Sequence, residues 1–187
     1  MNYSIPKIAI MLMSSFVFSA SHAADINAGK AKAMVCAGCH GSDGVSKSPM
    51  FPSLAGQTSL YLANQLKHFR DGTRENATMN GLAKGLQDNE IENLAAYFSS
   101  LPSKSAGGDA GLAETGKAKA GMCMGCHGNQ LQGNGPMPKL AGQQPQYISK
   151  QLGDFKSGSR KAGQMNAIAK SLSDEDIKAL AEYVGSL

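Results

Sequence analysis

The chain has 187 residues, which is enough for one ordinary domain or for two small ones. Its 18 basic and 14 acidic residues leave a net charge of +4, and no basic run with interleaved aromatic residues indicates nucleic-acid binding. Tryptophan is absent and glycine occurs 22 times, so two small domains would be marginal on apolar burial alone. We therefore expect a bound group to complete each core.

The first 23 residues carry the pattern of a secretory signal peptide. Lys7 supplies a positive charge, Ile8 to Ala20 form an apolar run, and small residues lead up to a cleavage point after Ala23. A retained membrane anchor is the alternative, but the run is shorter than the roughly 20 residues of a spanning helix. We predict a cleaved signal peptide over residues 1–23 and a protein exported to the periplasm.

The elements predicted after the signal peptide are helices. A first helix containing "GKAKA" (Gly29 to Ala33) leads into the stretch "MVCAGCH" (Met34 to His40). A second helix has an apolar face from Tyr61 to Phe69, and a last helix carries an apolar stripe from Ile91 to Leu101. Residues 41–52 are rich in glycine, serine and proline, which is typical of a loop. Because no alternating strand pattern occurs, the predicted fold class is all-α.

The same elements return in the second half of the chain. "GKAKA" recurs at Gly116 to Ala120, "LAGQ" at 54–57 recurs at 140–143, and the last apolar stripe recurs from Ile177 to Leu187. Such a register indicates one module used twice. A stretch rich in glycine, serine and alanine separates the copies and is typical of a linker. The predicted boundaries are 24–102 for domain 1, 103–112 for the linker and 113–187 for domain 2.

All four cysteines lie in two Cys-x-x-Cys-His motifs. A dithiol redox site, a zinc site and a pair of structural disulfides are alternatives, but none of them explains a histidine directly after each cysteine pair. Covalent haem c does, because the thiols form thioethers and the imidazole lies under the iron. The motifs therefore predict two covalently bound haem c groups. The expected attachment residues are Cys36, Cys39, Cys123 and Cys126, and the expected proximal iron ligands are His40 and His127.

The sixth iron position needs a second donor. His68 aligns with Asp154 and is expected at the surface, so no repeated histidine remains. Among ten methionines only Met79 and Met165 match in the two copies, and each is followed by asparagine. Packing in the core is the ordinary use of methionine, but the repeat favours axial ligation as in histidine–methionine cytochromes. We predict Met79 as the ligand in domain 1 and Met165 in domain 2.

The repeated motifs, with "LAGQ" after each haem motif and "AAYFSSL" at 95–101, resemble the dihaem cytochrome c4 family over the whole mature chain. The resemblance implies two tandem class I cytochrome c domains. It also implies that the carbonyls of Pro52 and Pro138 accept a hydrogen bond from the proximal imidazoles. By the same resemblance, Gly29 and Gly116 allow the first helix of each domain to press against the last.

An iron with two protein ligands has no vacancy for substrate, so the expected protein is a periplasmic electron carrier and not an enzyme. The resemblance implies delivery from a quinol-oxidising cytochrome bc complex to a haem–copper terminal oxidase, and we expect a monomer. A dihaem peroxidase and the haem subunit of a flavocytochrome sulfide dehydrogenase are the alternatives. Membrane association stays open. Gln65 and Gln151 could bond haem propionates, organise the contact between the modules or find partners within their own module. Arg74 and Arg160 are either propionate partners or solvent-exposed residues.

Overall fold

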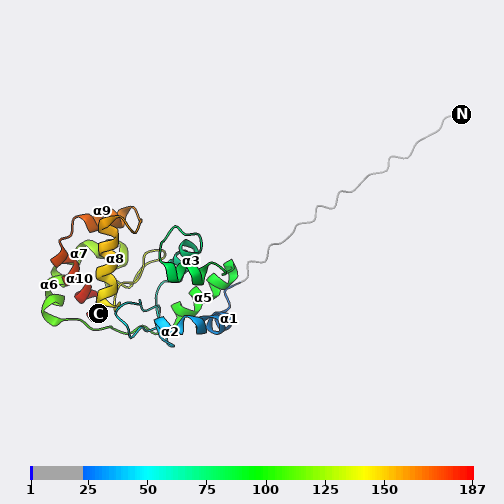
Figure 1. Ribbon diagram of the computed structural model, residues 1–187, viewed down its shortest axis with the longest axis horizontal. Helices are drawn as coiled ribbons and strands as arrows, with labels where there is room; N and C mark the ends of the chain where they lie inside the picture. The colour runs from blue at the N-terminus through cyan, green and yellow to red at the C-terminus, as the bar shows by residue number, and fades with distance from the viewer. Residues whose placement is uncertain (2–22) are drawn as a thin grey trace.

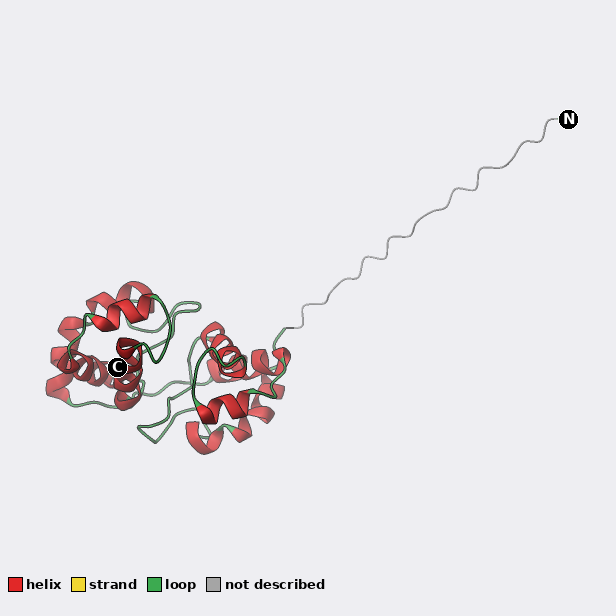
Figure 2. Cartoon of the chain, turned by 45° about the horizontal axis from the view of Figure 1, so that its top comes forward, coloured by secondary structure: helices red, strands yellow, loops and turns green. Residues whose placement is uncertain are grey.

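The computed structural model of the chain describes Met1 and residues 23–187, so the predicted signal peptide lies almost wholly outside the described residues. The described chain forms two groups of helices joined by loops, one group from each half of the sequence (Figure 1). Helices and loops without a named strand make up these residues (Figure 2), which confirms the all-α class. Within residues 23–187, no helix is long and apolar enough to cross a membrane.

In the first module the last helix, α5, packs against the helices α1 and α3. Helix α1 crosses α5, and α3 packs on both α4 and α5. Ile91 of α5 is fully buried at the centre of the core. The elements are α1 (Ile26–Lys32), the 3-10 turn η1 (Ala33–Val35), α2 (Ala37–His40), α3 (Ser59–Arg70), α4 (Ala77–Ala83) and α5 (Asp88–Ser100).

The second module repeats this arrangement with longer N-terminal helices. Helix α6 packs along α10, which also contacts α8, and α8 in turn packs on α9. A capping box between Ser173 and Asp176 starts α10. Helix α6 begins inside the segment predicted as the linker, whose extended part therefore ends at Asp109. The elements are α6 (Ala110–Lys119), α7 (Gly121–His127), α8 (Pro145–Ser157), α9 (Gln164–Lys170) and α10 (Asp174–Ser186).

The three predicted helices of each module are present, with two differences. Leu101 and Leu187 close the predicted apolar stripes, but each residue follows the end of its helix and caps it. The short helices α4 and α9, which carry Met79 and Met165, were not predicted. Each has only seven residues, which is too short for a periodic apolar pattern to stand out.

The predicted close contact of the first and last helix is confirmed in both modules. A Cβ atom added to Gly29 would lie 2.1 Å from the carbonyl oxygen of Asn93 on α5. A Cβ atom added to Gly116 would lie at the same distance from the carbonyl oxygen of Ala179 on α10. Glycine at these two positions therefore lets one helix backbone rest directly on the other.

Candidate functional site

The four cysteines lie on short helical turns, half-buried and free of disulfides. Burial raises the pKa of the Cys123 thiol, and burial together with neighbouring Cys39 raises the pKa of Cys36. A dithiol redox site needs at least one thiol with a lowered pKa, because the thiolate is the reactive form. Neither Cys36 nor Cys123 therefore fits the reactive thiol of that alternative. Among the described residues, no three His, Cys, Asp or Glu side chains gather as a zinc site would require.

The two histidines that follow the cysteines are buried, with exposed fractions of 7% for His40 and 6% for His127. Nδ1 of His40 lies 2.8 Å from the carbonyl oxygen of Pro52, and Nδ1 of His127 lies 2.8 Å from that of Pro138. Because a carbonyl oxygen can only accept, each Nδ1 carries the hydrogen and each Nε2 keeps its lone pair for a metal. The hydrogen bonds expected for Pro52 and Pro138 are confirmed.

Burial also bears on the charge of His40. It lowers the pKa of this side chain, while the hydrogen bond to Pro52 acts in the opposite direction. The neutral imidazole, which is the form that binds metal ions, is therefore favoured at neutral pH. The predicted surface position of His68 is confirmed, since that side chain is exposed on α3.

The methionines separate by burial. Met79 on α4 and Met165 on α9 are partly buried. Met124 is also partly buried, but it packs against the apolar core of the second module. The others between residues 23 and 187 are exposed, namely Met34, Met50, Met122 and Met137. Met79 and Met165 are thus the two partly buried methionines that lie outside the core contacts made by Met124 and that also match in the repeat.

The asparagine after each methionine fixes the helix that carries it. Nδ2 of Asn80 donates to the carbonyl oxygens of Phe69 (2.6 Å) and Arg74 (2.9 Å), and Oδ1 accepts from the backbone N–H of Asn76 (2.7 Å). Asn166 makes the three equivalent bonds in the second module. The repeated Met-Asn pair therefore combines a partly buried thioether with the residue that anchors its helix.

Replacing Asn166 with alanine is expected to loosen helix α9, because three backbone groups lose their partner. We expect a loss of about 1–3 kcal/mol for the local structure around Met165. If Met165 ligates the iron as predicted, the measurement is the denaturant concentration at which the far-red iron–thioether absorption band of the oxidised protein disappears. Asn129→Ala, at an exposed position, is the matched control; an equal effect of both substitutions would contradict the assigned anchor.

The two glutamines and two arginines whose roles were left open lie together in a contact between the modules. Nη1 of Arg74 donates to Oε1 of Gln65 in its own module (2.7 Å), and Nη2 donates to Oε1 of Gln151 in the other module (2.8 Å). Arg160 repeats the pattern with Gln151 at 2.5 Å and Gln65 at 3.0 Å. Hydroxyl groups from both modules complete the network, those of Tyr61 and Tyr147.

The two arginines lie in this interface without an acidic partner. Within residues 23–187 neither guanidinium group forms a salt bridge, and the acceptors around both are neutral amides and hydroxyls. Each guanidinium group also lies over an aromatic ring, 4.6 Å from that of Phe69 and 4.5 Å from that of Phe155. Two half-buried cations with neutral neighbours suit anionic groups such as haem propionates. The donor set and this charge both fit haem c.

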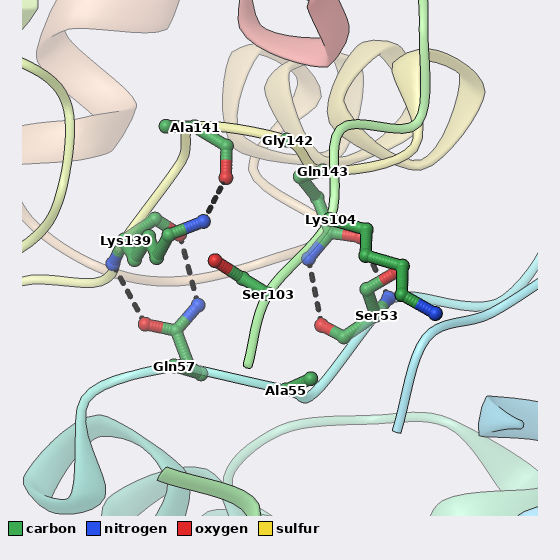
Figure 3. A pocket seen from close by; sticks show the side chains of 9 residues that line it. All are labelled: Ser53, Ala55, Gln57, Ser103, Lys104, Lys139, Ala141, Gly142 and Gln143. Atoms are coloured by element: carbon green, nitrogen blue, oxygen red, sulfur yellow. Dashed lines mark hydrogen bonds between the residues drawn. The ribbon is translucent and has the colours of Figure 1, made fainter. Parts of the chain in front are cut away.

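A second contact between the modules was not predicted. Gln57 bonds the backbone of Lys139 through both ends of its side-chain amide, and Gln143 does the same with Ser53 (Figure 3). Both glutamines are buried, with exposed fractions of 6% and 7%. They are the last residues of the two "LAGQ" stretches. A repeated polar residue inside an otherwise small and apolar motif is the signal that could have drawn attention to them.

Two all-α modules in tandem, each with a Cys-x-x-Cys-His turn and a methionine-bearing helix, define a c-type cytochrome of two domains. The cytochrome c family model matches residues 26–102 and again 113–187. The chain belongs to the dihaem cytochrome c4 family. It is 39% identical to cytochrome c4 of Pseudomonas aeruginosa, over 96% of this chain and 97% of that protein.

Two further comparisons agree in length and fold. The crystal structure of reduced recombinant cytochrome c4 from Pseudomonas stutzeri superposes with a TM-score of 0.82 and 38% identity, over 88% of this chain and 100% of that chain. A thiosulfate dehydrogenase electron acceptor from Stutzerimonas stutzeri is 36% identical, over 83% of this chain and 80% of that protein. The chain is therefore a dihaem c-type cytochrome, an electron-transfer protein and not an enzyme.

Proposed function

We propose that each module would hold one haem c through its two cysteines, with one histidine and one methionine as the ligands to the iron. Cys36 and Cys39, with His40 and Met79, serve the first haem. Cys123, Cys126, His127 and Met165 serve the second. Haem c supplies one-electron exchange at its iron. The observation that carries the proposal is the duplicated donor set, in which a histidine with a fixed Nδ1–H and a partly buried methionine recur in register.

The residues of the chain have three tasks in this function. The prolines orient the imidazoles through their carbonyl groups, so that Nε2 faces the metal. The asparagines hold the helices of the methionines. Arg74 and Arg160 place positive charge between the modules, which would suit the propionates of a bound haem. Histidine with methionine raises the reduction potential, which suits a carrier late in an electron-transfer chain.

The proposed physiological role is transfer of single electrons in the periplasm from a quinol-oxidising cytochrome bc complex to a terminal oxidase. The cytochrome c4 relatives support a carrier with separate redox partners. Residues 1–23 serve as the signal peptide, 24–102 and 113–187 are the two domains, and 103–112 are the linker. The chain acts as a monomer whose contacts with partners are small and transient.

A second candidate role is to accept electrons from a dehydrogenase of reduced sulfur compounds. The relative named a thiosulfate dehydrogenase electron acceptor supports this role. The two roles share the haem sites and differ only in the donor. One carrier can serve both donors, so the choice rests on measured rates.

Stopped-flow absorbance with the purified holoprotein distinguishes the two donors. In the first role, quinol reduces both haems rapidly only when the bc complex is added, and terminal oxidase with oxygen reoxidises them. In the second role, thiosulfate with thiosulfate dehydrogenase reduces the haems faster than quinol with the bc complex does. Reduction by neither system above the rate without enzyme would contradict both roles.

A further inference from the structure

A glutamine of each module hydrogen-bonds the backbone of the other module, at the residue after the proline that bonds the histidine. Nε2 of Gln57 donates to the carbonyl oxygen of Lys139 (2.9 Å), and Oε1 accepts from the N–H of Lys139 (2.7 Å). Gln143 makes the two equivalent hydrogen bonds to Ser53, at the same two distances. Figure 3 shows the two side chains reaching in opposite directions across the cleft between the modules.

Ser53 and Lys139 come directly after the two prolines whose carbonyl groups bond the histidines. The N–H of Ser53 and the carbonyl of Pro52 therefore belong to one peptide group. Among the described residues every peptide bond is trans, so the C=O and N–H of this group point in opposite directions. His40 donates to one side of the peptide group, while Gln143 of the other module accepts on the opposite side. The same chain of bonds connects His127 through the peptide group after Pro138 to Gln57.

We infer that Gln57 and Gln143 are positioning residues that act across the module boundary, each helping to set the reduction potential of the other module's haem. The inference rests on the proposed haem sites. Each glutamine acts through a peptide group on a histidine and touches no reacting atom. The inference goes beyond those sites, because Gln57 lies in the first module and influences the second haem, while Gln143 lies in the second module and influences the first haem.

The physical basis is polarisation along connected hydrogen bonds. An amide whose N–H is hydrogen-bonded has a more electron-rich carbonyl oxygen, and such cooperativity strengthens the next bond by about 10–30%. A stronger acceptor at Nδ1 makes the imidazole a more basic iron ligand. A more basic ligand stabilises ferric over ferrous iron and lowers the reduction potential. Loss of the glutamine is therefore expected to raise the potential of the haem in the other module.

The surroundings hold the glutamines in this arrangement. Oε1 of Gln57 also accepts from the backbone N–H of Thr58 (2.9 Å), and Oε1 of Gln143 accepts from that of Gln144 (3.0 Å), where helices α3 and α8 begin. Both side chains are almost fully buried, so water competes little for their bonds. Ser103 and Lys104 of the linker segment line the same cleft. The orientation of each amide is thus fixed from both modules.

The test is a redox titration of the holoprotein with Gln57→Leu and, separately, Gln143→Leu. We expect Gln57→Leu to raise the reduction potential of the second haem and Gln143→Leu to raise that of the first. Each shift should correspond to an increase of about twofold in the equilibrium constant for reduction. Each potential is assigned to its haem with Met79→His and Met165→His backgrounds, since bis-histidine ligation lowers the potential of the altered haem. Should a leucine variant not fold, Gln57→Met and Gln143→Met provide the same loss of hydrogen bonding with an unbranched side chain.

The matched control is Gln144→Leu. Nε2 of Gln144 also crosses between the modules, but it donates to the carbonyl oxygen of Ser46 (2.7 Å) and not to a peptide group that follows a proline. Three results would overturn the inference. The potential of the haem in the mutated module could change instead, both potentials could change equally, or neither potential could change. A change in Gln144→Leu that equals the change in the two test variants would also overturn it. Absence of a c-type haem spectrum in the unmodified protein would instead contradict the proposed function.

Discussion

Replacing Met165 with alanine is expected to open one of the two irons to carbon monoxide. If both irons hold six ligands as proposed, the purified, dithionite-reduced protein should show no rapid change in its visible spectrum. Without the thioether of Met165 the second haem keeps only His127 as its protein ligand, and one carbon monoxide binds per chain. The measurement is a titration of the reduced visible spectrum with carbon monoxide.

Met137→Ala is the matched control for this substitution, because Met137 lies in the same module but is exposed and unmatched in the first module. This control should behave as the unmodified protein does. Prompt binding at one haem of the unmodified protein would reveal an open site and favour an enzyme such as a dihaem peroxidase. A Met165→Ala protein that still excludes carbon monoxide would show that another residue occupies the sixth position.

The largest effect on stability is expected from Gly116→Ala. The added methyl group would lie 2.1 Å from the carbonyl oxygen of Ala179, and both atoms belong to packed helix backbones that cannot move aside alone. Overpacking of this kind costs about 1–3 kcal/mol, and more where backbone must shift. We expect the free energy of unfolding to fall by about 3 kcal/mol, as measured by denaturant titration of the holoprotein.

Gly153→Ala is the control for this prediction. Gly153 lies within helix α8 with open space around its Cα, and Lys67 stands at the equivalent position of the first module. Alanine there should increase the free energy of unfolding by at most about 1 kcal/mol, through helix propensity. A loss at Gly116 no larger than the change at Gly153 would mean that α6 can slide away from α10, and the close contact would then not be a requirement of the fold.

The duplication, the haem motifs and the main helices could be predicted because their signals are local. Cys-x-x-Cys-His is defined by neighbours in the sequence, and the stripe from Ile91 to Leu101 spans enough turns to reveal a helical period. Because the module is repeated, a residue in one copy can be compared with the equivalent residue in the other. This comparison singled out Met79 and Met165 from ten methionines, and the partial burial of both is consistent with that prediction.

The contacts between the modules could not be predicted for a physical reason. Gln57 meets Lys139 only after both modules have folded and docked, so nothing near Gln57 in the sequence reports the contact. The alternatives for Gln65 and Gln151 could not be separated for the same reason. Helices α4 and α9 were missed because their boundaries depend on tertiary hydrogen bonds, such as those from Asn80 to the end of α3 and the loop after it.

The reciprocal bonds of Arg74 and Arg160 give one polypeptide the contact of a symmetric dimer. In an isologous interface the same patch serves on both sides, so each residue is used in two equivalent places. Here each arginine bonds the glutamines of both modules, and each glutamine accepts from both arginines. A change in one copy of such a residue disturbs the partners of the other copy as well. A substitution in this contact therefore affects both modules at once. A substitution on the surface that faces away from the contact affects only its own module.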